Sequence, residues 1–360
     1  MTAARRTGPA LPAAFAAVTT LAAPAVASPA ATPPRAAAPG TGAGAAAACT
    51  GTAPVVCHFD AAPRYLPCHG ADRRRRRGPY PVGAETRRTV LGETPTAFGR
   101  TVVRAFAVDV REPGGEPTGA GGSPGLDLTF RGPAPLVADV HVAPRRPYSA
   151  AGPDRGLDRP RSARRPYTCW GQELPQYLRA GISVANHADS GESSQTCLDQ
   201  PQLFPTVRPL IRRGDTVLIQ LARNDKRTTE ADYRANLTTM IDAIRAQGGR
   251  PVLVTPIVRR WFNADGTLDN GTALLVNGLG VDQQAQIRLL ATERHVPLIE
   301  LTALTRQRVE ELGPDGSRAL YLTDEQRDNP HTSERGATEY AAMVRDALRA
   351  QHLLPAGRFR

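Results

Sequence analysis

The sequence predicts an α/β protein, in which a three-layer α/β/α domain with a mostly parallel sheet follows a small, partial β-sandwich. From about residue 165 onward, apolar strand-like runs alternate with helical segments. Such alternation with short connections produces a parallel sheet that helices cover on both faces. Between residues 81 and 145, strand-like runs instead follow one another without helices, separated by Gly/Pro-rich turns. This second pattern is typical of a small antiparallel sandwich.

The first 80 residues differ from the rest in composition and lack its periodic pattern. Residues 1–27 have the pattern of an export signal, with Arg5 and Arg6 at the start, an apolar run behind them and small residues before Ser28. An Ala/Pro-rich tail is the alternative. Residues 28–80 are Ala/Pro/Gly-rich and show no sustained period of 2 or 3.6, so we expect them to be irregular. The export signal favours a secreted, extracellular protein, and no later run is long and apolar enough for a membrane span.

The partial sandwich is assigned to residues 81–145 from runs of β-branched and apolar residues. The run 101–110 alternates in part between apolar and polar side chains, as a half-buried strand does. The other runs lie at 89–91, 126–130 and 137–142.

The C-terminal domain is assigned to residues 165–353. Residues 216–221 are continuously apolar or nearly so, as expected of a strand that is buried on both faces. Thr229, with Asp232 three residues later, resembles a capping box that opens a helix over 230–247. The remaining elements are a strand over 251–256, a helix over 282–294, a strand over 296–301 and a helix over 333–351.

Charge and cysteines add weaker indications. The net charge is +11, and residues 73–77 are five consecutive arginines. No aromatic residues interleave with them and no nucleic-acid motif accompanies them, so a solvated loop is the preferred interpretation. The five cysteines are an odd number with no zinc-type spacing, so we expect no metal site. Cys169 and Cys197 flank the region of the site described next, and export would permit a disulfide between them.

Two loops at strand ends carry polar residues suited to catalysis. Asn224 comes just after the strand at 216–221, and Asp328 lies three residues before His331, in front of the last helix. A carboxylate at this spacing can orient an imidazole and stabilise its protonated form, and a side-chain amide can donate to an oxyanion. In parallel sheets such sites lie at the carboxyl ends of strands. Taken alone, a loop ion pair and an ordinary turn explain these residues equally well.

The order and spacing of several motifs resemble those of the rhamnogalacturonan acetylesterases, which belong to the SGNH (GDSL-like) hydrolases. The early part of the resemblance runs from Tyr167 to Ser194 and includes Trp-Gly-Gln at 170–172. The segment 220–226 resembles the Gly-x-Asn-Asp block of the family, and 328–337 resembles its closing Asp-x-x-His block. The resemblance spans about residues 165–350 and implies a flavodoxin-like sheet.

The resemblance also implies roles for individual residues. His331 would be the general base and Asp328 its orienting carboxylate. Gly191, through its backbone N–H, and Asn224, through its amide, would form the oxyanion hole. The chemistry implied is ester hydrolysis without a metal or organic cofactor.

Two departures from the family pattern stand out. Ala222 replaces the usual glycine and Arg223 replaces a frequent histidine. The family's first strand, which ends in Gly-Asp-Ser with the nucleophilic serine, should lie between about 145 and 155. If Gly152 is the family's glycine, Asp154 occupies the serine position. Because proline opposes a central strand, we expect 146–164 to be an irregular linker in its place. The loss of the expected strand and serine has two alternative explanations, decay of the gene and a local reading-frame disturbance.

The sequence therefore predicts a secreted, monomeric carbohydrate esterase that removes acetyl esters from a pectin-like polysaccharide, with no nucleic-acid or membrane partner, and impaired by loss of its nucleophile. One alternative is a catalytically inactive polysaccharide-binding protein, and another is a binder of anionic surfaces that acts through the arginines at 73–77. Four serines remain possible substitutes for the nucleophile: Ser149, Ser162, Ser190 and Ser193.

Overall fold

The computed structural model describes most of the chain from residue 48 onward. The described residues are 48–61, 64–72, 81–85, 88–94, 102–110, 125–132, 135, 137, 139–142, 149–152, 167–189 and 191–360, with the backbone alone at 48, 64–72 and 149–152. The expected export signal at 1–27 and the arginines at 73–77 lie outside this set.

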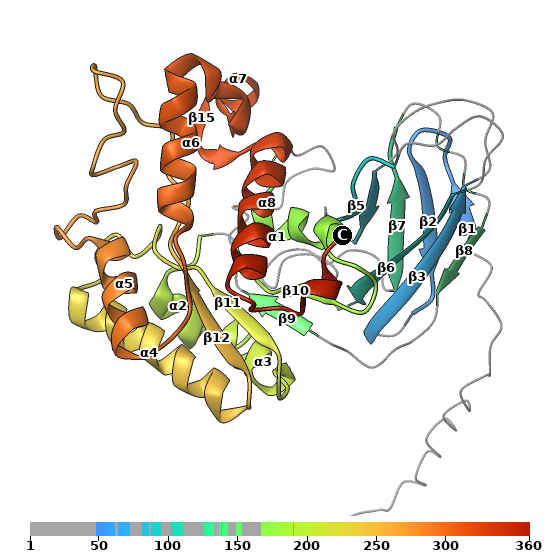
Figure 1. The fold of residues 1–360 in the computed structure, drawn as a ribbon, viewed down its shortest axis with the longest axis horizontal. Coiled ribbons are helices and arrows are strands. Elements are labelled where there is room, and N and C mark those ends of the chain that lie inside the picture. Colours follow the sequence, from blue (N-terminus) through green and yellow to red (C-terminus); the bar gives the residue numbers. More distant parts are fainter. Residues whose placement is uncertain are drawn as a thin grey trace, which may run out of the picture. The chain divides into compact units, whose positions relative to one another are not determined.

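A five-stranded parallel sheet forms the centre of the C-terminal domain (Figure 1). Its order is β10–β9–β11–β12–β13, and every neighbouring pair is parallel. Its strands are β9 (Ser149–Gly152), β10 (Ser183–Asn186), β11 (Thr216–Ile219), β12 (Arg250–Val254) and β13 (Leu298–Ile299). Counted along the chain this is the 2-1-3-4-5 order of flavodoxin-like sheets, in which a site lies where the winding reverses, between the first and third strands. The predicted parallel α/β domain is confirmed.

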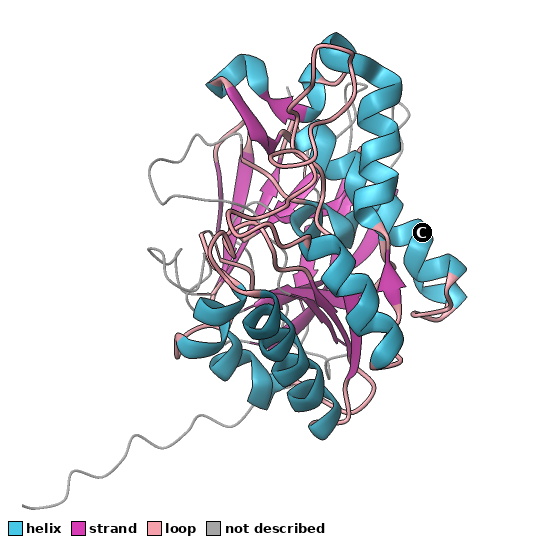
Figure 2. Cartoon of the chain, turned by 90° about the vertical axis from the view of Figure 1, so that its left-hand side faces the viewer, coloured by secondary structure: helices cyan, strands magenta, loops and turns pink. Residues whose placement is uncertain are grey.

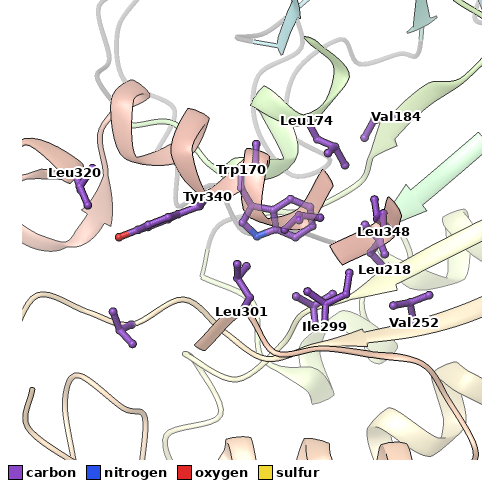
Figure 3. Close-up of a cluster of buried hydrophobic side chains, with 14 of the residues drawn as sticks. Trp170, Leu174, Val184, Leu218, Val252, Ile299, Leu301, Leu320, Tyr340 and Leu348 are labelled. Atoms are coloured by element: carbon purple, nitrogen blue, oxygen red, sulfur yellow. The ribbon is translucent and has the colours of Figure 1, made fainter. Parts of the chain in front are cut away.

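Helices cover both faces of this sheet (Figure 2). On β11, Leu218 belongs to one buried cluster, whereas Val217 and Ile219 belong to the other, as the alternation of side chains along a strand requires. The first cluster adds residues of α1, α6 and α8 (Figure 3), and the second adds residues of α2 to α5. The helices are α1 (Trp170–Glu173), α2 (Ser194–Asp199), α3 (Phe204–Val207), α4 (Glu230–Ala246), α5 (Gln283–Glu293), α6 (Leu301–Gly316), α7 (Thr323–Gln326) and α8 (Glu334–Ala350).

Local signals account for the predicted helices. The Thr229 hydroxyl accepts a hydrogen bond from the Asp232 amide at 3.1 Å and so caps α4. Gly248, with φ of +79°, follows the end of α4 in the left-handed region. Ser333 caps α8 through the Gly336 amide at 3.1 Å. Helix α6, which begins at Leu301 where the sequence predicts the end of a strand, was missed.

The N-terminal part contains two antiparallel sheets that share one hydrophobic cluster. The five-stranded sheet has the order β1–β2–β7–β4–β5, with β1 (Ala48–Thr50), β2 (Val55–Phe59), β4 (Val82–Ala84), β5 (Arg88–Leu91) and β7 (Leu126–Phe130). The three-stranded sheet has the order β6–β3–β8, with β3 (Arg64–Asp72), β6 (Val102–Val110) and β8 (Asp139–Val142).

The expectation that residues 28–80 are irregular is wrong for their second half, because β1, β2 and β3 lie there. Strand β2 pairs with β7, and β3 pairs with β6 and β8, so the partners come from far along the sequence. Strand formation depends on such cross-strand packing more than on a local pattern. A search for local periodicity therefore could not find these strands.

Strand β9 corrects the expectation of an irregular linker over 146–164. Ser149–Gly152 form a central strand that pairs with β10 on one side and with β11 on the other. The argument from proline fails because Pro147 and Pro153 lie outside the strand, one on each side of it. The segment consists of small residues and lacks the large apolar side chains typical of a central strand, but backbone pairing with two flanking strands does not require them.

The cysteine pairing also differs from expectation. A disulfide joins Cys49 to Cys57, which face each other on β1 and β2. The predicted bridge between Cys169 and Cys197 is not formed: both residues are buried outside any disulfide. Cys169 lies next to Asn186, whose amide points to its sulfur at 4.0 Å, whereas Cys197 packs in the cluster that contains α4. Sequence spacing could not show that the two have different neighbours.

Among the helices that the structure describes, none has the length and apolar character needed to cross a bilayer.

Candidate active site

His331 and Asp328 form a closely bonded pair on β15 (Asp328–Thr332), which pairs antiparallel with β14 (Tyr321–Leu322). The His331 amide donates to Asp328 Oδ1 at 3.0 Å, and the ring nitrogen Nδ1 hydrogen-bonds Oδ2. The rings of Tyr167 and His331 pack perpendicular to each other, with the ring centroids 5.2 Å apart. One carboxylate thus fixes both the backbone and the ring, which leaves Nε2 as the nitrogen available for proton transfer.

The surroundings of His331 favour its neutral form. Burial lowers the pKa of His331 below its ordinary value, and the nearby cations Arg223 and Arg259 lower it further, while the hydrogen bond and charge of Asp328 act in the opposite direction. A neutral imidazole at neutral pH can accept a proton from a substrate or a nucleophile. The pair therefore has the chemistry of a general base with its orienting carboxylate.

Asn224 and Gly191 lie in two loops that contact each other. The Asn224 amide donates to the Glu192 carbonyl at 3.3 Å, next to Gly191. Gly191 has φ of +89°, a conformation that favours glycine. Arg223, adjacent to Asn224, donates to the carbonyl of Pro330, the residue before His331, at 3.0 Å. The loop after β11 therefore contacts both the loop that contains Gly191 and the segment that leads into His331.

The buried carboxylate of Asp225 anchors the loop that carries Gly191. Asp225 is fully buried and accepts hydrogen bonds from the Ser194 amide at 3.0 and 3.1 Å and from the Ser194 hydroxyl at 2.6 Å. The Asn236 amide donates to the same hydroxyl at 3.0 Å. The loop that carries Gly191 is thus anchored to the segment that carries Asn224. Sequence analysis assigned no role to Asp225.

A pocket opens beside His331 at this edge of the sheet. Trp170 on its wall donates its indole N–H to the side-chain oxygen Oε1 of Gln220 at 3.2 Å, and the side-chain Nε2 of Gln220 donates to the Thr255 carbonyl at 3.0 Å. Of the predicted site residues that the structure describes, His331 alone lines this pocket; Asp328 is hydrogen-bonded to His331, and Asn224 follows the lining residue Arg223 in the chain. The lining residues are Tyr167, Thr168, Cys169, Trp170, Gln220, Arg223, Ile257, Pro330, His331 and Thr332.

The residues considered for the nucleophile position fall partly within the described part of the chain. Strand β9 ends at Gly152, and Asp154, two residues later, lies outside the described residues, as do Ser162 and Ser190. Ser193 is the N-cap of α2 and accepts a hydrogen bond from the Thr196 amide at 3.1 Å, which gives it a structural role. Only the backbone of Ser149 is described, within β9.

Within the described part of the chain, no group of three or more His, Cys, Asp or Glu side chains is placed to hold a metal ion.

A flavodoxin-like parallel sheet is followed at its carboxyl edge by loops that carry a His–Asp pair, a side-chain amide and a glycine, an arrangement suited to ester hydrolysis. The chain is 32% identical to the rhamnogalacturonan acetylesterase RhgT of Bacillus subtilis (strain 168) over 197 residues, which are 51% of this chain and 81% of RhgT. It is 28% identical to the probable rhamnogalacturonan acetylesterase YesY of the same organism over 189 residues, 50% of this chain and 82% of YesY. The chain belongs to the rhamnogalacturonan acetylesterase family and is by descent a hydrolase of ester bonds.

A solved structure extends the likeness in fold. The crystal structure of the Bacillus subtilis protein YxiM matches with a TM-score of 0.51 at 20% identity, over 83% of this chain and 80% of YxiM. No profile of a known protein family matches the chain.

Proposed function

We propose that the protein is a secreted carbohydrate esterase that acts on acetyl esters of a pectin-like polysaccharide, and that its catalysis is impaired because Asp154 stands where the nucleophilic serine belongs. The bonded pair of Asp328 and His331, beside a pocket at the carboxyl edge of the sheet, carries the proposal. The names of RhgT and YesY support the substrate class. The pattern of residues 1–27 supports export.

The mechanism in an intact site is a two-step acyl transfer. His331 removes the proton of a serine hydroxyl, and the oxygen attacks the acetyl carbonyl carbon. The Gly191 N–H and the Asn224 amide stabilise the oxyanion, and the sugar hydroxyl leaves with the proton from His331. A water molecule, deprotonated by His331, then attacks the acetyl-enzyme. Acetate departs and the serine regains its proton.

An aspartate at the serine position cannot replace it. A carboxylate has no proton for His331 to remove and is a much weaker nucleophile toward an ester than an alkoxide. Its negative charge would also oppose the oxyanion that must form nearby. We therefore expect the chain to hydrolyse esters at near-background rates.

The second candidate is an inactive polysaccharide-binding protein. It is favoured by the coexistence of a built pocket, with Tyr167 and Trp170 in its lining, and an aspartate at the nucleophile position. Tyr167 is partly exposed, and a tyrosine ring beside polar groups suits a sugar ring, whereas Trp170 is buried. The two candidates make the same prediction for binding and differ in ester turnover.

Two measurements test these proposals together. Wild type and the His331→Ala variant are assayed on an aryl acetate, and the binding of wild type to acetylated pectin is compared with its binding to chemically deacetylated pectin. Weak turnover that His331→Ala abolishes, with preferential binding of acetylated pectin, supports the impaired esterase. Binding with turnover equal to that of His331→Ala supports the binding protein. Absence of both turnover and binding contradicts both.

A further inference from the structure

Arg223 joins three loops at the carboxyl edge of the sheet. It lies just after β11, is 7% exposed, and its guanidinium donates through Nη1 to the Pro330 carbonyl at 3.0 Å and through Nη2 to the Ile257 carbonyl at 3.1 Å. Ile257 follows β12, and Pro330 precedes His331 on β15. A single side chain therefore connects the ends of β11 and β12 to the segment that carries the imidazole.

The contact with Pro330 involves the peptide unit that leads into His331. The carbonyl of this unit accepts from Arg223, and its N–H, which belongs to His331, donates to Asp328 Oδ1 at 3.0 Å. A cation thus binds one end of the peptide dipole and an anion the other. Hydrogen bonds polarised in this way strengthen each other, and both are charge-assisted. The peptide plane before His331 is fixed from both sides.

The geometry of the side chain explains why arginine is needed. A guanidinium presents its N–H groups in a planar fork and can serve two carbonyls at fixed positions, whereas a lysine ammonium is a point donor on a flexible stem. The neighbouring loop residues are held independently, because the Arg260 amide donates to the Asn329 carbonyl at 3.1 Å. Arg223, in contrast, hydrogen-bonds Pro330, the residue directly before His331.

We propose that Arg223 is a positioning residue for His331, which holds the Pro330–His331 peptide in place and so directs the imidazole into the pocket. This inference rests on the proposed function, since a directed imidazole matters only if His331 acts as a base. It concerns a residue that departs from the family pattern, so the arrangement is a property of this chain. Among the residues that the structure describes, the charged and titratable groups that act on the imidazole are Asp328, Arg223, Arg259 and Tyr167.

The test measures His331 itself and does not require ester turnover. Wild type, Arg223→Lys and Arg223→Met are labelled at the histidine Cε1 atoms, and the His331 resonance is assigned among the seven histidines with His331→Ala. Its pH titration gives the pKa, and hydrogen exchange gives the protection of the His331 amide. Arg288→Met is the control, because Arg288 is bonded to Glu300 at 2.8 Å, in an ion pair that includes none of the groups facing His331.

Two results are expected. Both Arg223 variants exchange the His331 amide at least about tenfold faster than wild type, since neither can make the two-carbonyl fork. The pKa of His331 rises in Arg223→Met, because a positive neighbour is lost, and changes less in Arg223→Lys, which keeps the charge. Arg288→Met changes neither quantity. Unchanged exchange in Arg223→Lys overturns the inference, whether or not Arg223→Met folds. Failure of the aryl acetate assay bears on the proposed function alone.

Discussion

Removing the Asp225 carboxylate should destabilise the fold strongly and loosen the Gly191 loop. In Asp225→Ala, the amide and the hydroxyl of Ser194 lose their acceptor in a site that is fully buried. The hydroxyl of Thr228, bonded at 3.0 Å, is partly exposed and can bind water instead. Two buried donors without partners cost about 1–3 kcal/mol each, so we expect a loss of about 2–6 kcal/mol in the free energy of unfolding.

Urea denaturation followed by tryptophan fluorescence measures this loss, and hydrogen exchange over residues 191–194 reports the loop. Asp199→Ala is the matched control, because Asp199 is exposed and its carboxylate accepts from Gln195 on the surface of α2. Surface changes of this kind stay within about 0.5 kcal/mol. If Asp225→Ala costs no more than Asp199→Ala, the view of Asp225 as the anchor of this loop is refuted.

Three further predictions follow from the structure. Burial raises the pKa of Glu173 from its ordinary value of 4.5 to about 7, so the folded state holds the proton more tightly, and its stability relative to Glu173→Gln should fall as the pH rises through this window. In urea denaturation, the free energy of unfolding of wild type should fall by about 3 kcal/mol relative to Glu173→Gln across this pH range. Identical pH profiles of the two proteins would refute the raised pKa. Thiol labelling of the unfolded, unreduced protein should modify both Cys169 and Cys197; protection of both would indicate a bridge. Asp328→Asn should lower the pKa of His331 in an NMR titration, because it removes the carboxylate that raises it, and a higher value would contradict the assigned pairing.

Features with local signals could be predicted from the sequence. The continuous apolar run at 216–221 contains β11, and the Thr229 cap and the following glycines bracket α4. Asp328 and His331 are three residues apart, so their contact is local as well. In each case the residues that decide the structure lie within one turn or strand of one another.

Features that depend on distant partners could not be predicted. Strand β9 has no apolar pattern and is defined by its neighbours β10 and β11. The contacts of Arg223 reach residues 34 and 107 positions away, and nothing in the local sequence points to Ile257 or Pro330. From the sequence, Arg223 stands out only as a departure from the family pattern. The structure shows that it hydrogen-bonds Pro330, next to His331.

The central claim is that an otherwise built ester-hydrolase site lacks only its nucleophile. Because β9 supplies the strand that sequence analysis expected to be absent, restoring the motif Gly-Asp-Ser at its end requires only Pro153→Asp together with Asp154→Ser. Loss of a catalytic serine costs about 10⁶-fold in turnover, so even partial recovery should raise kcat on an aryl acetate by at least about 10³-fold over wild type. Adding His331→Ala to the double variant should remove the gain. If wild type already turns over at ordinary enzyme rates and His331→Ala abolishes this, another serine is the nucleophile and the claim is wrong.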